Sequence, residues 1–215
     1  MKIYLKNGTF LGVGFLGLSI LSILFIDKPL AIFIHNHGFD QLMYFRFITE
    51  NLSIIYEITA ILLILISSFE KHLLSKLGFT VYCILIILVT ASIKTKFKIY
   101  LGREWVKTWS KAPISLINDN IYGFYGRHPN NWQGSYPSGH TSLVSVISFI
   151  LLIIYPKYKY IWISLILVII AALIILDFHF LGDCLAGIAL GGIMSYYLIG
   201  IYIFLRNKFK SEVYF

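Results

Sequence analysis

Runs of apolar residues, separated by short polar stretches, dominate the pattern of this 215-residue chain. None of the runs alternates strictly as a membrane barrel strand does, and each is compatible with a helix. A hydrocarbon core about 30 Å thick needs roughly 20 apolar residues per helical span, so the pattern predicts an all-α integral membrane protein with about six transmembrane helices in one bundle. We expect a single membrane domain over residues 1–215. The predicted spans are residues 9–26, 52–69, 77–93, 141–155, 161–176 and 184–205.

Composition and charge indicate the kind of partner. Hydrophobic residues make up 58% of the chain and charged residues 13%, a balance far more apolar than that of soluble globular domains. The net charge of +8 is compatible with a polyanionic partner, but the basic residues lie between apolar runs and form no continuous stripe, which argues against nucleic acid. The expected partners are therefore the bilayer and its anionic lipid headgroups. We interpret the two cysteines, Cys83 and Cys184, as packing residues.

The polar stretches between the runs predict the orientation. Six spans put both termini on one side, and the basic residues divide equally between the two sides, so their number does not decide which side is cytoplasmic. Their distribution favours one answer, because each predicted inner segment is short and basic, whereas most outer basic residues fall within residues 96–139. We expect a bacterial inner (cytoplasmic) membrane protein with both termini cytoplasmic. Residues 96–139 are then an active-site segment that faces the periplasm or the exterior.

The sequence Pro137-Ser138-Gly139-His140 stands directly before an apolar run. Proline and serine in this position predict the beginning of a helix, where free backbone N–H groups can bind an anion. Ser138 adds a hydroxyl donor, Gly139 lets the backbone approach a ligand closely, and His140 can carry a proton near neutral pH. The alternative interpretation is a helix cap with an incidental histidine.

A second polar element, with His179 and Asp183, lies between the last two apolar runs. Residues four apart share one face of a helix, so the carboxylate can hold one ring nitrogen and leave the other directed at a substrate. Alternatively, Asp183 only caps the last helix and His179 is an interfacial side chain. Because successive runs alternate in direction, residues 96–103, the Pro137–His140 turn and this element are all predicted at the same membrane face.

At these residues the chain resembles the type 2 phosphatidic acid phosphatase superfamily, membrane relatives of bacterial acid phosphatases and vanadium haloperoxidases. The pattern of that family is Lys-x6-Arg-Pro, then Pro-Ser-Gly-His, then Ser-Arg-x5-His-x3-Asp. The second element is complete at Pro137–His140, and the His-x3-Asp half of the third is present at His179 and Asp183. The resemblance runs from about Lys96 to Gly187, and the usual fold of the family also has six helices.

The resemblance implies a mechanism and roles for individual residues. His179 would attack phosphorus and form a phosphohistidine, Asp183 would orient it, and His140 would protonate the leaving oxygen. Ser138 and the N–H of Gly139 would hold the phosphoryl oxygens. No metal or other cofactor is implied.

The third family element departs from its pattern in this chain. Leu173 stands where the family has a phosphate-gripping arginine, and Ala172 replaces the serine before it. Arg103 is the first candidate to stand in for the missing arginine, because it lies in the Lys-rich element, and Arg127 is the second.

The first family element can be aligned in two ways. Lys96 and Arg103 satisfy Lys-x6-Arg, but Glu104 replaces the proline. Alternatively, the run from Lys98 to Arg103 matches a common local form of the motif and puts Trp105 at the family's arginine. The sequence leaves both alignments open. The predicted phosphate-binding residues are Lys96, Lys98, Arg103, Arg127, Ser138 and Gly139.

These features together predict a metal-independent lipid phosphate phosphatase, a phosphoric ester hydrolase that acts on a phosphate monoester or diphosphate at the outer membrane face. Undecaprenyl diphosphate, phosphatidylglycerol phosphate, phosphatidic acid and lipid A are candidate substrates, and the sequence does not rank them. Two alternatives stay open. One is a lipid phosphotransferase that uses the same site, and the other is a non-catalytic binding or transport protein on a degenerate phosphatase scaffold. The oligomeric state is not determined by the sequence.

Overall fold

The computed structural model describes residues 1–41, 77–108, 114–127 and 132–212, together with positions 51, 58, 62 and 64; side chains are described as far as residue 208. Within these ranges the regular structure is helical, and extended residues pair only in two isolated bridges, Arg103 with Phe124 and Trp105 with Ser115. The all-α prediction is confirmed for the described residues. The helices are α1 (Lys2–Phe25), α2 (Asp27–Asn36), η1 (Phe39–Gln41), α5 (Leu77–Leu101), α6 (Leu116–Asp119), α7 (Gly139–Ile154), η3 (Pro156–Tyr158), α8 (Lys159–Ile175) and α9 (Leu181–Glu212).

Four described helical stretches are long and apolar enough to cross a membrane: Lys2–Phe25, Leu77–Leu101, Pro156–Ile175 and Leu181–Lys208. The apolar helix α7 is shorter, with 16 residues. The predicted span 52–69 lies outside the described residues apart from three isolated positions, so the number of six spans stays a prediction. Each of the other five predicted spans coincides with a helix.

The third predicted span is longer than its apolar run. The sequence pattern ends it at residue 93, whereas α5 continues to Leu101, so the segment 96–139 begins inside a helix. A helical backbone satisfies its own hydrogen bonds, and lysine side chains can extend from a helix end toward water, so three lysines do not end the helix. Helical geometry puts Lys94 and Lys98 on one face and Lys96 on another, so Lys96 has different surroundings from the other two lysines.

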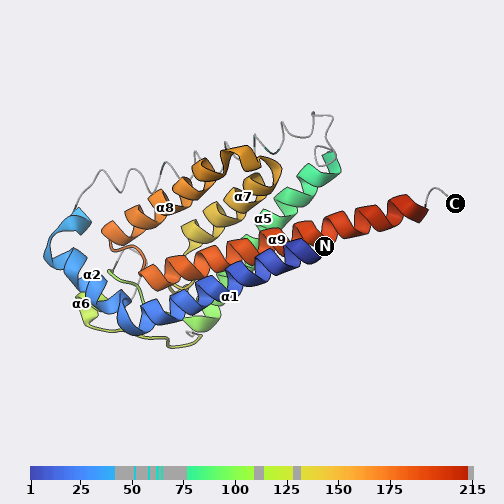
Figure 1. Cartoon of the computed structure of the whole chain (residues 1–215). Coiled ribbons are helices and arrows are strands. Elements are labelled where there is room, and N and C mark those ends of the chain that lie inside the picture. The colour runs from blue at the N-terminus through green and yellow to red at the C-terminus, as the bar shows by residue number, and fades with distance from the viewer. Residues whose placement is uncertain are drawn as a thin grey trace.

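Helix α9 packs against α1 along most of the length of α1, and the two helices are antiparallel (Figure 1). Glycines of α1 make this close approach possible. A Cβ atom added to Gly8 would lie 2.6 Å from the Tyr197 ring, and one added to Gly12 would lie 2.6 Å from Ile193. In a membrane the hydrophobic effect does not drive helices together. Small residues favour helix association there because they let the backbones approach closely.

The other face of α9 packs against α7, and here the glycines belong to α9. A Cβ atom at Gly187 would come within 2.9 Å of Thr141, and one at Gly191 within 2.6 Å of Ser145. The small-xxx-small pair Gly187 and Gly191 therefore allows close helix packing. This contact sets the beginnings of α7 and α9 side by side, at the end of the bundle that carries the polar residues.

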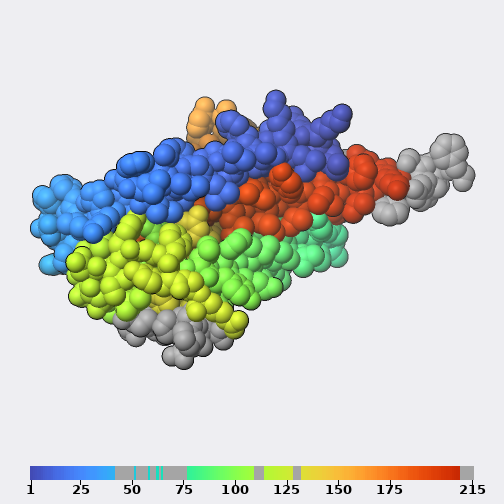
Figure 2. Space-filling view, turned by 90° about the horizontal axis from the view of Figure 1, so that it is seen from below, coloured from blue at the N-terminus to red at the C-terminus, as the bar shows by residue number. Residues whose placement is uncertain are grey.

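At that end, α1 bends at Ile26 into the short helix α2. The described part of the segment between α5 and α7 lies against α1 and α2, as the yellow-green atoms show in Figure 2. The N-terminus lies toward the opposite end of the bundle (Figure 1). The polar elements that the sequence predicts at one membrane face thus meet at one end of the bundle.

Candidate active site

The turn between α8 and α9 positions the histidine of the third element. Helix α8 ends at Ile175, and the carbonyl oxygen of Leu173 accepts hydrogen bonds from the N–H groups of Phe178 (3.0 Å) and His179 (3.3 Å). Asp177 adopts a left-handed conformation with φ of 52°, which aspartate tolerates better than most residues. The chain therefore reverses tightly and places His179 two residues before the start of α9, where only 4% of its surface is exposed.

Asp183 holds the imidazole of His179, as the spacing of the two residues predicts. Its Oδ2 lies 3.3 Å from Nδ1 of His179 and accepts a 3.2 Å hydrogen bond from the N–H of Phe180. Because a bond to a carboxylate requires hydrogen on Nδ1, the Nε2 atom keeps its lone pair. Burial lowers the pKa of His179 to about 4, an effect to which the charges of Lys98 and His140 add. The ring is therefore neutral at physiological pH and can act as a nucleophile.

Arg103 occupies the other oxygen of Asp183. Its Nη1 donates to Oδ1 of Asp183 at 2.6 Å, and its Nη2 donates to Oδ2 of Asp27 at 2.8 Å. The side chain has no exposed surface, and the ring of Phe180 lies 4.2 Å from its guanidinium carbon. Burial opposes the charge, but the carboxylates of Asp183 and Asp27 outweigh it and raise the pKa of Arg103 above its ordinary value. Two carboxylates take up its charge, so the geometry favours a positioning role over the phosphate-binding role that the sequence predicts.

The beginning of α7 meets the beginning of α9 at this site. The N–H of Ser138 donates to the carbonyl oxygen of Asp183 at 2.9 Å. Ser138 is fully buried and is the N-cap of α7, because its Oγ accepts bonds from the N–H (3.3 Å) and hydroxyl (3.0 Å) of Thr141. The alternative of a helix cap is thus confirmed for Ser138. The cap uses Oγ as an acceptor, so it does not conflict with the predicted donation of the hydroxyl hydrogen to phosphate, which stays a prediction.

Two lysines of α5 lie against the same helix start. A Cβ atom added to Gly139 would be 3.4 Å from Nζ of Lys94 and 3.7 Å from the Lys98 side chain. Nζ of Lys98 is buried and donates to the carbonyl oxygens of Gly134 (2.9 Å) and Ser135 (3.0 Å). Sequence reasoning missed Lys94, although its position four residues before Lys98 on one helix carries the signal.

The alignment that begins at Lys98 agrees with the contacts of Trp105. Nζ of Lys98 lies 4.7 Å from the centre of the Trp105 ring, and that ring lies 5.1 Å from the ring of His179. Lys96, the other candidate, is exposed. The structure therefore brings Lys98 and Trp105 to the histidine and leaves Lys96 on another face of α5.

The remaining predicted residues lie nearer the surface. His140 is exposed in the first turn of α7, close enough for its charge to contribute to the lowered pKa of His179. Arg127 is also exposed, and its guanidinium carbon lies 5.7 Å from the ring of Tyr100 on α5. Tyr100 is four residues beyond Lys96, so this contact places Arg127 on the Lys96 side of α5 rather than on the Lys98 side.

The comparison with known families decides the identity of this arrangement. The family model described as the PAP2 superfamily matches residues 79–207, which is more than half of the chain. The chain belongs to the PAP2 superfamily. The match includes α5, α7, α8, α9 and the polar segment between α5 and α7.

This PAP2 chain is also similar to a solved structure. It is the crystal structure of a transmembrane PAP2 type phosphatidylglycerolphosphate phosphatase from Bacillus subtilis, with 14% sequence identity and a TM-score of 0.39. The similarity covers 93% of this chain and 92% of the other. None of the curated proteins matches the chain.

At the position of the third-element arginine of the PAP2 pattern, both the residue and its surroundings are apolar. Leu173 has no exposed surface and packs in a cluster of buried residues with Val144 and Ile169. Trp105, at the first-element arginine in the alignment that begins at Lys98, lies beside the catalytic histidine of the pattern. The described cations nearest the start of α7 are therefore lysines rather than arginines.

Proposed function

We propose that this PAP2 protein is a membrane lipid phosphatase that uses His179 as its nucleophile. One observation carries the proposal. His179 is a buried imidazole whose Nδ1 is held by Asp183 while no described residue bonds to its Nε2, and burial lowers its pKa so that the neutral form is favoured. This is the arrangement that an activated nucleophile needs, since the base form is available and the ring cannot rotate away.

The proposed reaction has two steps. In the first, the lone pair of His179 Nε2 forms a bond to phosphorus while the bond from phosphorus to the lipid oxygen breaks. The lipid oxygen keeps that electron pair and takes a proton from His140. In the second, water attacks phosphorus, the N–P bond breaks with its electron pair returning to Nε2, and His140 accepts the proton of the water. The products are inorganic phosphate and a lipid alcohol or, from a diphosphate, a lipid monophosphate.

Binding of the phosphoryl group is assigned to Lys98, Lys94 and the N–H groups at the start of α7. Phosphoryl transfer depends mainly on positioning and on positive charge around the equatorial oxygens. Nζ of Lys94 and Cε of Lys98 lie beside Gly139 at the start of α7, where the backbone N–H groups and the helix dipole favour an anion. Lysine supplies charge without the rigid fork of arginine, so we expect weaker transition-state stabilisation than two arginines would provide.

An apolar cavity beside this site supports a lipid as the substrate. It has a volume of about 420 Å³ and lies between α1, α5 and α9, with Leu16, Phe97 and Leu190 among its lining residues. Pro137 also lines it and directly precedes the Ser138 cap of α7. A hydrocarbon chain in this cavity would therefore have its phosphate end at the start of α7. We propose that the cavity holds the first part of the lipid chain of the substrate.

A second candidate function follows from Trp105 and Leu173. Leu173 stands at the third-element arginine and, in the alignment that begins at Lys98, Trp105 stands at the first-element arginine, so a phosphate could be bound without being transferred. The second candidate is therefore a lipid-phosphate binding protein on the same scaffold.

Phosphate release separates the two functions. Purified protein in detergent or nanodiscs is given phosphatidic acid, phosphatidylglycerol phosphate and a polyprenyl diphosphate, and inorganic phosphate is measured over time. The phosphatase proposal expects turnover of at least one lipid, its loss in His179→Ala, and inhibition by vanadate, which mimics the five-coordinate transition state. Saturable lipid binding without phosphate release would instead establish the binding protein. Transfer of phosphate to an added lipid alcohol would identify a phosphotransferase.

The side of the membrane is part of the proposal, with the site at the outer face and both termini in the cytoplasm. Tyr125 lies in the polar segment and is 57% exposed, and the two native cysteines are buried. In intact cells, Tyr125→Cys should react with an impermeant maleimide without lysis. A reporter fused after residue 215 should be cytoplasmic. If the variant were labelled only after lysis, the site would face the cytoplasm, and its substrates would be lipids of the inner leaflet.

A further inference from the structure

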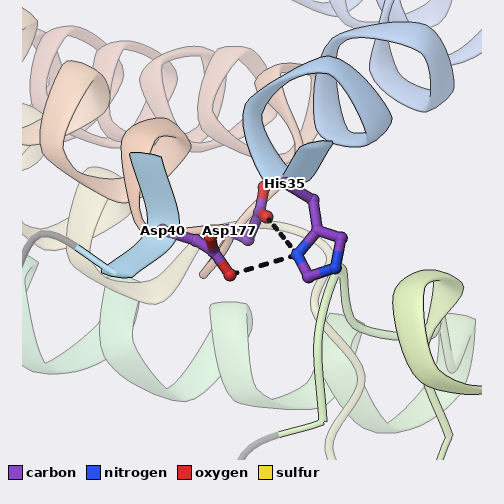
Figure 3. A group of neighbouring side chains, drawn as sticks. All are labelled: His35, Asp40 and Asp177. Atoms are coloured by element: carbon purple, nitrogen blue, oxygen red, sulfur yellow. Dashed lines mark hydrogen bonds and ion pairs between the residues drawn. The ribbon is translucent and has the colours of Figure 1, made fainter. Parts of the chain in front are cut away.

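Three ionisable side chains meet on the side of the catalytic turn that faces α2. His35 comes from the last turn of α2, Asp40 from η1, and Asp177 from the turn that carries His179 (Figure 3). Nδ1 of His35 lies 3.1 Å from Oδ2 of Asp40 and 3.9 Å from Oδ2 of Asp177. One ligand atom from each residue lies within 4.8 Å of the others.

Two carboxylate oxygens of this cluster are buried without a hydrogen bond from any described residue: Oδ1 of Asp40 and Oδ2 of Asp177. Asp177 is only 1% exposed, and its Oδ2, which accepts no hydrogen bond from a described residue, is directed at His35. A buried carboxylate oxygen normally has a partner, because leaving it unpaired forfeits its hydration.

We propose that His35, Asp40 and Asp177 form a binding site for a divalent transition-metal ion of the zinc type. Imidazole nitrogen and carboxylate oxygen are both ligands of Zn²⁺, and water would complete the coordination. A metal held at about 2.0–2.2 Å from each ligand separates the ligand atoms by roughly 3–4 Å. The separations of 3.1 and 3.9 Å from Nδ1 of His35 fall within this range, and all three ligand atoms lie within 4.8 Å of one another.

The ammonium of Lys107 is the competitor for this site. Its Nζ donates to the same Oδ2 of Asp40, and its side chain is 27% exposed. A metal that takes this oxygen must displace the ammonium, which can move outward to water on its flexible stem. We therefore expect a change at Lys107 to affect metal affinity in the direction opposite to a change at a ligand.

The proposed metal would act on the structure of the active site without touching the phosphate. It would tie α2 and η1 to the turn from Asp177 to His179, two residues before the proposed nucleophile. Because the bound state is favoured only when these elements are in place, the metal would stabilise the folded form by mass action. The proposal does not depend on the phosphatase activity and is tested by metal binding itself.

The test uses full-length, tag-free protein that has been stripped with EDTA and returned to nanodiscs. Zn²⁺ binding is measured by calorimetry, and Co²⁺ serves as a spectroscopic substitute through its visible absorption bands. Wild type should bind one equivalent of Zn²⁺, and the thermal midpoint should rise on binding. We expect Asp177→Asn and His35→Gln each to weaken binding about tenfold or more, as loss of one of three protein ligands should.

Two further variants make the result specific. His37→Gln is the matched control, because His37 lies two residues from His35, is exposed, and bonds through Nδ1 to the carbonyl oxygen of Phe33. It should keep wild-type affinity. Lys107→Met should bind Zn²⁺ more tightly by removing the competing ammonium. His35→Gln covers the case in which Asp177→Asn fails to fold, since His35 is partly exposed. Absence of Zn²⁺ and Co²⁺ binding by wild type, or equal loss in His35→Gln and His37→Gln, would overturn the site.

Discussion

Two histidine–aspartate clusters lie on either side of one turn, and their carboxylates differ in how many hydrogen bonds they accept. Asp183 accepts bonds on both oxygens, from Arg103 on one and from His179 and the N–H of Phe180 on the other. Asp177 retains a buried oxygen that no described residue bonds. Both carboxylates are almost fully buried, so exposure to water does not explain the difference.

The difference separates a carboxylate that orients a group from one that can accept a cation. A fully bonded carboxylate such as Asp183 has a fixed position and can hold an imidazole in one orientation. An unsatisfied buried polar group costs about 1–3 kcal/mol, so a ligand that satisfies Asp177 gains that much in affinity before any other contact is counted. The predictions that follow first test the cluster around His179 and Asp183. The last one tests Glu104, whose carboxylate has one oxygen bonded by a described residue and one that no described residue bonds.

The largest effect is expected for His179→Ala. The change removes the proposed nucleophile, so phosphate release should fall by on the order of 10⁴-fold or more. The measurement is kcat on the best lipid substrate, with folding checked by size-exclusion chromatography. His37→Ala is the matched control and should retain wild-type turnover. A His179→Ala protein with substantial activity would remove this cluster from the mechanism.

The next effect compares the two carboxylates that share Arg103. Asp183→Asn loses the charge that stabilises the imidazolium-like nitrogen of His179, and kcat should fall about 10³-fold. Asp27 bonds, among the described residues, to Arg103, Ser22 and the N–H of Gly182 and not to His179, so the loss in Asp27→Asn should be about tenfold. Thermal midpoints of both proteins separate a loss of folding from a loss of chemistry. Equal losses would mean that the Asp27–Arg103–Asp183 bridge acts as a unit.

A moderate effect is expected for Lys98→Ala, and almost none for Lys96→Ala. Lys98 lies against Gly139 and Trp105 beside the histidine, whereas Lys96 is exposed on another face of α5. We expect kcat/KM to fall about 10²-fold in the first variant and less than about twofold in the second. Lys94→Ala should resemble Lys98→Ala. A loss of activity in Lys96→Ala that exceeds the loss in Lys98→Ala would favour the alignment of the first family element that begins at Lys96.

The smallest effect concerns Glu104, whose carboxylate is half satisfied. Its Oε2 accepts a 2.8 Å bond from the N–H of Gly123, while Oε1 is buried without a partner among the described residues. Burial raises its pKa to about 7 from the ordinary 4.5, so its contribution to stability is complete below pH 4.5 and is lost as the pH rises through 7. Glu104→Gln cannot ionise, and its thermal midpoint should exceed that of wild type at pH 8 but not at pH 4.5. A wild-type midpoint that rises between these two values of pH would contradict this assignment.

The candidate site was partly predictable, and Arg103 shows where prediction ended. Its partner Asp27 lies 76 residues away and belonged to no recognised motif, so nothing in the local pattern connected the two. Removing the arginine would leave two buried carboxylates without their cation, a loss of about 3–5 kcal/mol. We therefore expect Arg103→Ala to reduce folding as well as activity, in place of the purely kinetic loss that a phosphate ligand would cause.

The sequence alone determined the features that depend on neighbours along the chain. The length of the apolar runs predicts the membrane helices, Pro137–His140 predicts a helix start, and the spacing of His179 and Asp183 predicts their contact. Only the tertiary structure decided what each ionisable group faces. It put Lys98 rather than Lys96 beside His179, enclosed Arg103 between two carboxylates, and joined His35 to Asp177. Local spacing fixes a residue's place on its helix, whereas the partner of a buried charge depends on which distant segments pack beside it.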